Sequence, residues 1–248
     1  MHRASLACAS LPRPAANFRK SAASVKLEWR SCLVFLAAGW LSLAGPVAAR
    51  AGEDQASAAR PPVWTPLFDG RSLGDWKPSN FGGEGPVTVA DKTILMEFGD
   101  SLTGIVYTKP FPQQNYELRL QAMRIDGIDF FCGLTFPVAQ SHCSLIVGGW
   151  AGAVVGLSCI DGRDASENAT TQYMKFEDGR WYAIRVRVTA ERIQCWIDDR
   201  RAIDQPLAGH RVSTRAEVQP SEPLGIAAWQ TKAALRNIEF RHLPKGER

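Results

Sequence analysis

The residues of this sequence that are best suited to chemistry lie between positions 128 and 150. They comprise an acid, a histidine, two hydroxyl side chains and two aromatic rings: Asp129, His142, Thr135, Ser144, Phe131 and Trp150. Aromatic rings stack on the apolar faces of pyranose sugars, and carboxylates accept hydrogen bonds from sugar hydroxyls. We therefore interpret Asp129 and His142 as candidate catalytic residues and the other four as candidate substrate-binding residues.

These side chains share one face only if the segment forms a β-hairpin. With Ala139 and Gln140 at the turn, the apolar residues face the core in two rows: Ile128, Phe130, Cys132, Leu134 and Phe136 on one strand, and Cys143, Leu145 and Val147 on the other. The candidate residues then lie on the opposite face, with His142 at its rim. A shift of one residue in the register would scatter them, and a solvated outer face is the alternative interpretation.

A second hairpin is predicted by the stretch WYAIRVRVTAERIQCWID, residues 181–198. Its apolar residues alternate with polar ones, which is the pattern of strands that bury one face. If residues 189–192 form the turn, the register has five pairs: Val188 with Ile193, Val186 with Cys195, Ile184 with Ile197, Arg185 with Trp196, and Arg187 with Gln194. Arg185 and Trp196 are therefore further candidate substrate-binding residues, or a solvated cation–π pair that stabilises the sheet.

Almost every other readable segment also has the character of a short strand. The segments are residues 93–98, 104–108, 115–123, 153–159, 172–176, 223–229 and 233–243, with a further short strand near Ala202. Turn-forming Gly, Pro, Asp and Asn residues separate them, and no convincing helix follows residue 62. The sequence predicts an all-β sandwich, as one domain over residues 63–244 with a tail at 245–248.

The first 62 residues differ in composition from the rest. Residues 1–49 hold six of the 29 basic residues and one of the 25 acidic residues, all within the first 30 positions, and end with the apolar run CLVFLAAGWLSLAGPVAA. This pattern predicts a secretory signal peptide, with an uncleaved anchor as the alternative, and residues 50–62 read as a flexible tether. We expect a periplasmic or extracellular protein without a membrane span after cleavage.

Removal of the leader leaves a nearly neutral protein of 23 basic and 24 acidic residues. Binding to nucleic acid draws on a strong basic excess, so this class of partner is excluded. Four cysteines remain, which are Cys132, Cys143, Cys159 and Cys195. Export permits disulfides in any of three pairings, while the alternative is four small buried apolar residues without a bridge.

A metal site is conceivable in the loop DGRDASEN. Asp161, Asp164 and Glu167 are spaced by three residues there, and carboxylate oxygens are ligands for Ca²⁺. The spacing does not match an EF-hand, and a plain acidic turn is the alternative. The cofactor is therefore unassigned from the sequence, with a divalent metal, Ca²⁺ or a transition metal, as the hypothesis.

Several motifs resemble a known bacterial family. LFDGRSLGDW at residues 67–76, NYEL at 115–118, the hairpin GRWYAIRVRVTAERIQCWIDD, and PLGIAAW followed by ALRNIEFRHL resemble successive landmarks of the 3-keto-disaccharide hydrolases, formerly domain of unknown function 1080. The resemblance covers residues 64–243. It implies an all-β antiparallel jelly-roll sandwich of the concanavalin A-like lectin/glucanase type, similar to concanavalin and laminin-G domains, with a carbohydrate site on a concave face.

The resemblance also implies a chemistry, in which sugars oxidised at C3 are cleaved. The ketone acidifies the C2 proton, a base removes it, and the glycosidic oxygen leaves C1, after which water adds to the glycal. Many members of the family carry Gln-Asp-His-Gly before the last strand, whereas this sequence has Ala227, Ala228, Trp229 and Gln230. A possible acid/base or ligand histidine is thus absent, and Trp229 joins the candidate substrate-binding residues.

Two hypotheses of function follow. The first is an exported enzyme that cleaves 3-keto-glycosides, oxidised disaccharides among them, as a lyase/hydratase or hydrolase. The second is a non-catalytic carbohydrate-binding or surface interaction module, favoured by the missing histidine. The side chains that line the concave face would distinguish them.

Overall fold

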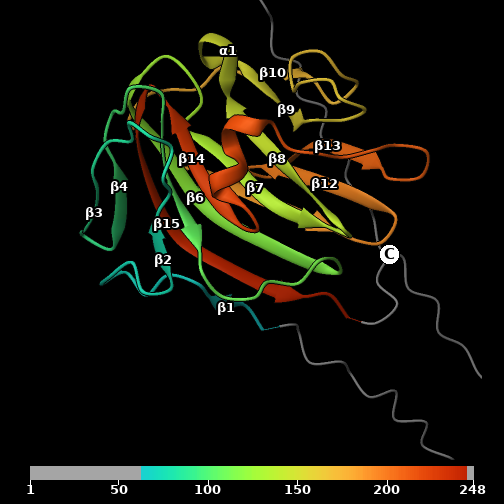
Figure 1. Ribbon diagram of the computed structural model, residues 1–248, viewed down its shortest axis with the longest axis horizontal. Coiled ribbons are helices and arrows are strands. Elements are labelled where there is room, and N and C mark those ends of the chain that lie inside the picture. The colour runs from blue at the N-terminus through green and yellow to red at the C-terminus, as the bar shows by residue number, and fades with distance from the viewer. Residues whose placement is uncertain (1–62, 245–248) are drawn as a thin grey trace, which may run out of the picture. The chain divides into compact units, whose positions relative to one another are not determined.

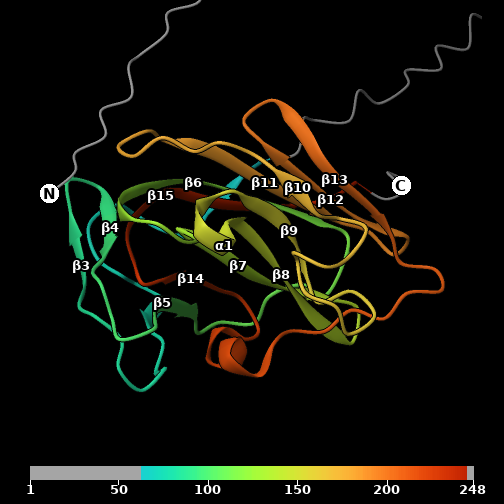
Figure 2. The ribbon, with the colours of Figure 1, turned by 90° about the horizontal axis from the view of Figure 1, so that it is seen from above.

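The computed structural model describes residues 63–244, which form two antiparallel β-sheets packed face to face (Figure 1). The predicted leader, tether and tail lie outside the described residues. Figure 2 shows the two sheets edge-on, with β6 and β15 in one layer and β7, β8 and β14 in the other. The predicted all-β sandwich is confirmed.

Sheet A contains eight strands. In spatial order they are β13 (Arg200–Pro206), β12 (Arg192–Ile197), β11 (Tyr182–Val188), β6 (Tyr116–Gly127), β15 (Thr231–His242), β4 (Thr93–Met96) and β3 (Val87–Ala90), and β1 (Thr65–Pro66) pairs with β15.

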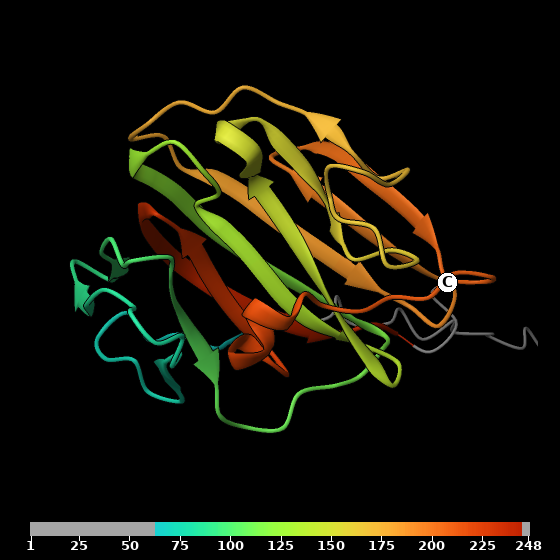
Figure 3. The same ribbon diagram turned by 45° about the horizontal axis from the view of Figure 1, so that its top comes forward.

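Sheet B contains seven strands. Their order is β10 (Gln172–Tyr173), β9 (Val154–Ser158), β8 (Ser141–Gly148), β7 (Cys132–Val138), β14 (Gly225–Trp229), β5 (Leu102–Tyr107) and β2 (Trp76–Pro78). Two short helical segments accompany the strands, namely α1 (Gly149–Gly152) and the 3-10 helix η1 (Ala216–Ser221). Figures 2 and 3 show η1 beside β14, on the side of sheet B that faces away from sheet A.

The hairpin of β11 and β12 has the predicted register at all five pairs. Ile184, Val186 and Val188 are buried between the sheets, because the period-two alternation turns every second side chain inward. Arg185 lies with its guanidinium carbon 3.7 Å from the centre of the Trp196 ring. The predicted cation–π pair is therefore present on the outer face of sheet A.

The hairpin of β7 and β8 also has the predicted register, with Leu134 opposite Leu145 and Thr135 opposite Ser144. The predicted alternation of core-facing and outward-facing side chains does not hold for the residues that precede β7. β7 starts at Cys132, and residues 128–130 form a bend, so the parity of the strand does not extend back through them. As a result Phe131 is fully buried in the core, and Ile128, predicted in the core, is 75% exposed.

The core lies between the sheets. Tyr116 is fully buried and donates its hydroxyl to the carbonyl of Pro137 at 2.7 Å, so a hydrogen bond joins β6 of one sheet to β7 of the other. Cys132, Cys143, Cys159 and Cys195 are all buried and free, which agrees with the interpretation that they form no disulfide. Burial raises the pKa of the Cys132 and Cys143 thiols, so neither is reactive. Within residues 63–244 no helix is long and apolar enough to cross a membrane.

Candidate functional site

The candidate site is a pocket on the outer face of sheet B. The alternation of β8 turns Cys143, Leu145 and Val147 into the core and leaves Ser144 and Ile146 on the outer face. A cavity of about 250 Å³ lies over this face. Its lining residues are Leu102, Asp129, Phe130, Ser144, Ile146, Trp150, Ser158, Arg215, Glu217, Val218 and Trp229.

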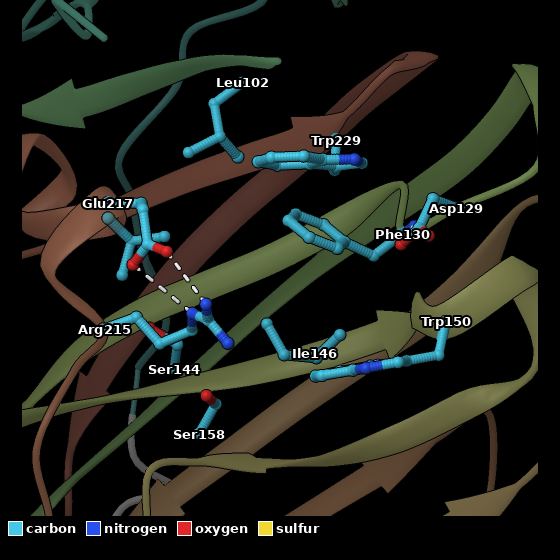
Figure 4. Close-up of a pocket in the computed structure, with 11 residues that line it drawn as sticks. Leu102, Asp129, Phe130, Ser144, Ile146, Trp150, Ser158, Arg215, Glu217 and Trp229 are labelled. Carbon is cyan, nitrogen blue, oxygen red and sulfur yellow. Dashed lines mark hydrogen bonds and ion pairs between the residues drawn. The ribbon is translucent and has the colours of Figure 1, made fainter. Parts of the chain in front are cut away.

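The walls of this pocket are aromatic and its two ends are charged (Figure 4). Trp229 and Phe130 lie on one side of the space, and Trp150 with Ile146 lies on the other. Asp129 is at one end, while Arg215 and Glu217 are at the opposite end. A planar ligand fits between such walls with its polar substituents directed at the charged ends.

Asp129 is held in place by backbone groups. Its Oδ1 accepts a hydrogen bond from the N–H of Phe130 at 2.7 Å, and its Oδ2 accepts one from the N–H of Ala151 at 3.3 Å. The N–H of Asp129 itself donates to Oγ1 of Thr231 at 3.3 Å. The carboxylate is therefore oriented without a cationic side chain among these contacts.

The segment that carries Trp150 has an unusual backbone. Trp150 and Ala151 both have left-handed conformations, with φ of 48° and 63°, so α1 is a compact loop rather than a regular helix. The loop places the indole of Trp150 against the pocket and leaves 42% of the residue exposed. Non-glycine residues in this region are uncommon and cluster at ligand sites, which supports a role for this loop in binding.

Arg215 organises the other end of the pocket. Its Nη2 donates to Oε1 of Glu217 at 2.8 Å, and its Nη1 contacts Oδ2 of Asp164. Asp164 in turn accepts a hydrogen bond from the hydroxyl of Ser158 at 2.7 Å. The side-chain hydrogen bond to Arg215 lowers the pKa of Glu217, and the same bond raises the pKa of Arg215, so both groups are charged.

The chain that carries Arg215 is attached to the edge of sheet B. Ser213 and Cys159 exchange two backbone hydrogen bonds of 2.6 and 3.1 Å, and the Ser141 hydroxyl donates to the Val212 carbonyl at 2.9 Å. The following η1 lies along β14 and β5 and contributes Glu217 and Val218 to the pocket. As a result, the segment that carries Arg215 and η1 lies over the outer face of sheet B, although its sequence has no strand-like or helical periodicity.

Four predicted site residues line this pocket together, namely Asp129, Ser144, Trp150 and Trp229. Thr135 lies beside them on the same face, and its hydroxyl is 2.8 Å from that of Ser144. His142 is also on β8, but its Nδ1 is 3.2 Å from a carboxylate oxygen of Glu222, and it is not among the pocket residues. The structure thus separates the two candidate catalytic residues.

Three predicted substrate-binding residues are placed wrongly by the sequence. Phe131 belongs to the core, because β7 begins after it, and Phe130 takes its place in the pocket. Arg185 and Trp196 lie on strands of sheet A, whose outer face is turned away from sheet B. Alternation identifies an outer face but does not say to which sheet it belongs.

The three predicted metal ligands do not form a ligand set. Asp161 accepts hydrogen bonds from the backbone of Arg211 and from His210, both at 2.8 Å, and the contact with Arg211 lowers its pKa. Asp164 faces Arg215, and the backbone N–H of Glu167 bonds to the carbonyl of Asp164. In the described part of the chain, no group of three or more His, Cys, Asp or Glu residues is arranged to hold a metal ion.

Sequence reasoning missed several residues of the pocket. Arg215 and Glu217 belong to the polar stretch at 205–222, which has neither the period of a strand nor a recognisable motif. Leu102, Ile146 and Val218 read as ordinary apolar residues. That Phe130, and not Phe131, lines the pocket could be predicted only if the first residue of β7 were known.

Comparison with known proteins gives a family match over most of the chain. A family model described as the 3-keto-alpha-glucoside-1,2-lyase-like domain matches residues 63–241. No curated protein matches the sequence.

Solved structures share the fold at low identity. A structure titled after endo-acting O-glycanases of the human gut microbiota has a TM-score of 0.52 and 9% identity, covering 73% of this chain and 99% of the other. A Bacillus subtilis protein of unknown function with a galectin-like fold has a TM-score of 0.50 and 9% identity, covering 73% and 94%. The carbohydrate-binding module CBM66 of Bacillus subtilis has a TM-score of 0.48 and 16% identity, covering 67% and 95%. The first two show a common sandwich fold.

Proposed function

This chain belongs to the family of 3-keto-alpha-glucoside-1,2-lyase-like domains, and we propose that it cleaves 3-keto-glycosides in the pocket on the outer face of sheet B. The observation that carries the proposal is the arrangement of Asp129 and Arg215 at opposite ends of one aromatic-walled cavity. A ring held between Trp229 and Trp150 would have a carboxylate at one edge and a guanidinium at the other. Binding of carbohydrate there is the first requirement of the proposal.

Asp129 is the better general base of the two acids in the pocket. Glu217 is hydrogen-bonded to Arg215, which lowers its pKa and makes it a weak acceptor for a carbon-bound proton. Asp129 accepts only backbone hydrogen bonds among its recorded contacts. We therefore assign proton abstraction to Asp129 and substrate orientation to Glu217.

The elimination then proceeds in three linked changes. Asp129 takes the proton from C2, and the electron pair of that C–H bond moves toward the C3 ketone, whose oxygen gains negative charge. Arg215, with a raised pKa, is the cation in the pocket that stabilises this enolate. The enolate re-forms the C3 ketone and gives the C1–C2 double bond as the C1–O bond breaks. The leaving oxygen keeps the bonding pair and takes the C2 proton back from Asp129, which becomes a carboxylate again. Water then adds across the double bond to give the free 3-keto-sugar.

The carboxylates of Asp161 and Asp164 do not fit as ligands of a divalent metal, since their oxygens accept hydrogen bonds from the Arg211 backbone and from His210, or face Arg215. We assign enolate stabilisation to Arg215, because it is the cationic side chain that lines the pocket. Export through the predicted leader remains part of the proposal and places the reaction in the periplasm or outside the cell.

The direct test is turnover of a 3-keto-disaccharide by the purified protein. We expect sugar release, with a 3-keto-glycal seen by NMR before hydration. Asp129→Asn should abolish release while binding persists, whereas Asp199→Asn, an exposed acid on the loop between β12 and β13, is the matched control. Absence of release by the unaltered protein, in the presence of each common divalent ion, would refute the proposal.

A non-catalytic carbohydrate-binding module is the second candidate function. It is favoured by one observation, which is that Ala227, Ala228 and Trp229 replace the histidine motif seen in many members of the family. Trp229 lines the pocket and supplies a stacking surface in place of an acid/base group. Binding of glycans without turnover of any 3-keto-glycoside would favour this function.

A further inference from the structure

A second pocket adjoins the candidate site. The loop Gly149–Gly152 contributes to both, because Trp150 lines the first pocket while Ala151 and Gly152 line a further cavity of about 520 Å³. The same division occurs at the bend before β7, where Asp129 lines the first pocket and Ile128 lines the second. Asp129, the proposed base, also accepts the N–H of Ala151, a residue of the second pocket, at 3.3 Å, so its carboxylate lies at the boundary between the two.

The second pocket is apolar and aromatic in its accessible part. Ile128 and Tyr173 are each 75% exposed, and both line the cavity. Exposed large apolar side chains that meet at one cavity mark a binding surface. The other lining residues are Arg124, Gly127, Ala151, Gly152, Ala153, Met174, Lys175, Phe176 and Asp178.

The polar groups of this pocket are poorly suited to sugar hydroxyls. Its lining contains no Ser, Thr, Asn, Gln or His side chain, and its one hydroxyl is that of Tyr173. Its one carboxylate, Asp178, accepts a hydrogen bond of 2.5 Å from Nε of Arg124. The remaining charged group is the ammonium of Lys175. A second sugar ring would find few acceptors for its hydroxyls, while a flat aromatic ring would find apolar contact.

One part of the wall of this pocket is built by buried contacts. Arg124 is 8% exposed, and its Nη2 donates to the carbonyl of Phe176 at 3.0 Å. Gly152 packs against it so closely that a Cβ at that position would lie 2.8 Å from Nη1 of Arg124. A side chain at Gly152 would displace the guanidinium, so glycine preserves the shape of the pocket.

We infer that the second pocket binds the leaving group of the substrate and that this leaving group is an aromatic alcohol, which makes the substrate a 3-keto aryl glycoside. The inference rests on the proposed function. With the keto-sugar between Trp150 and Trp229, the C1–O bond lies at the boundary marked by Asp129, and the aglycone enters the space beside Tyr173 and Ile128.

The acid groups of the two pockets are compatible with the same assignment. Their carboxyl groups are Asp129, which is the base, and Glu217 and Asp178, which face arginines. Asp129 is thus the lining carboxyl that can return the C2 proton to the leaving oxygen, and no second acid lines the pockets to assist cleavage of the C1–O bond. A phenol has a pKa of about 10, as tyrosine does, so its oxygen leaves with the bonding pair more readily than an alkoxide and depends less on such an acid. The ammonium of Lys175 on the pocket wall favours the phenolate, whereas the charge of Arg124 is balanced by Asp178.

The test compares phenyl and methyl 3-keto-glucosides as substrates of the full chain. Phenolate is intrinsically the better leaving group, so the informative quantity is the change in the phenyl-to-methyl ratio of kcat/KM between variants. We expect Tyr173→Ala to lower this ratio about tenfold, and Ile128→Ser to lower it as well. Phe98→Ala, which removes an exposed aromatic outside both pockets, is the matched control and should leave the ratio unchanged.

The outcomes separate this inference from the proposed function. Turnover of both substrates with an unchanged ratio in both variants would overturn the inference and leave the function standing. A larger effect of Tyr173→Ala on a 3-keto-disaccharide than on the phenyl compound would overturn it in favour of a sugar leaving group. If no 3-keto-glucoside is turned over, saturation-transfer NMR with unoxidised phenyl glucoside decides: ring contacts that Tyr173→Ala removes support an aromatic-binding pocket, and their absence refutes it.

Discussion

Sheets A and B both present tryptophan, arginine and carboxylate side chains on their outer faces, and they arrange them in opposite ways. On sheet A the groups satisfy one another: Glu117 accepts hydrogen bonds from Arg185 at 2.9 Å and from Arg241 at 2.7 Å. Arg185 also covers the ring of Trp196. On sheet B, Asp129 is held by backbone groups and Trp150 is partly exposed over a cavity.

The difference follows from where the residues come from in the fold. The pairs on sheet A are neighbours on adjacent strands, such as Arg185 and Trp196, and the register brings them into direct contact. The residues of the sheet B pocket come from bends and loops as well as strands, and the loop Gly149–Gly152 and η1 hold them around a space. Similar side chains thus stabilise the frame on one face and form a candidate site on the other.

The largest expected effect tests the sheet B face at its proposed base. Asp129→Asn keeps the shape and the shorter backbone hydrogen bond, from Phe130, but removes the basic carboxylate, so we expect kcat for a 3-keto-glycoside to fall about 10²–10⁴-fold. Steady-state kinetics give the value, and the unfolding midpoint should change little. A variant with full activity would exclude Asp129 as the base.

The next effect concerns stability and tests the sheet A face. Glu117 is 1% exposed and is paired with Arg185 and Arg241, so Glu117→Gln leaves two guanidinium groups without their buried counter-charge and with one acceptor oxygen between them. Because both arginines reach solvent, we expect a loss of about 2 kcal/mol in the free energy of unfolding, less than for a fully buried pair. Urea denaturation measures it. Turnover should be unchanged at temperatures where the variant is folded.

The sequence predicted the frame better than the site, for physical reasons that particular residues illustrate. Alternation over 182–197 and 132–147 fixes which residues pair, and both registers agree with the structure. Alternation does not extend through the bend at 128–130, so the predicted positions of Phe130 and Phe131 were exchanged. Arg215 and Glu217 belong to a stretch without periodicity and are far from Asp129 in the sequence. No local pattern therefore indicates that they share a pocket with Asp129.

The third effect returns to the pocket and concerns affinity. Trp150→Ala removes one aromatic wall, and we expect the dissociation constant for a bound sugar to rise about two- to tenfold, as the loss of a stacking contact predicts. Isothermal titration with the unaltered protein and Asp129→Asn provides the reference. Trp181→Ala is the matched control, since this tryptophan directly precedes β11 of sheet A and lies under Arg236. Equal losses in both variants would show that the sheet B pocket has no special role in binding.

The smallest effect concerns the cation–π pair that the sequence had offered as part of a site. Trp196→Leu removes the ring under Arg185 while keeping an apolar side chain, and a partly exposed pair of this kind contributes about 0.5–1 kcal/mol. We expect the free energy of unfolding to fall by that amount. Urea denaturation of Trp196→Leu, Glu117→Gln and the double variant measures the losses. The two losses should not add, because Arg185 contacts both Glu117 and Trp196. A fall in turnover in the folded Trp196→Leu variant would instead return Arg185 and Trp196 to the functional site and undo the distinction between the two faces.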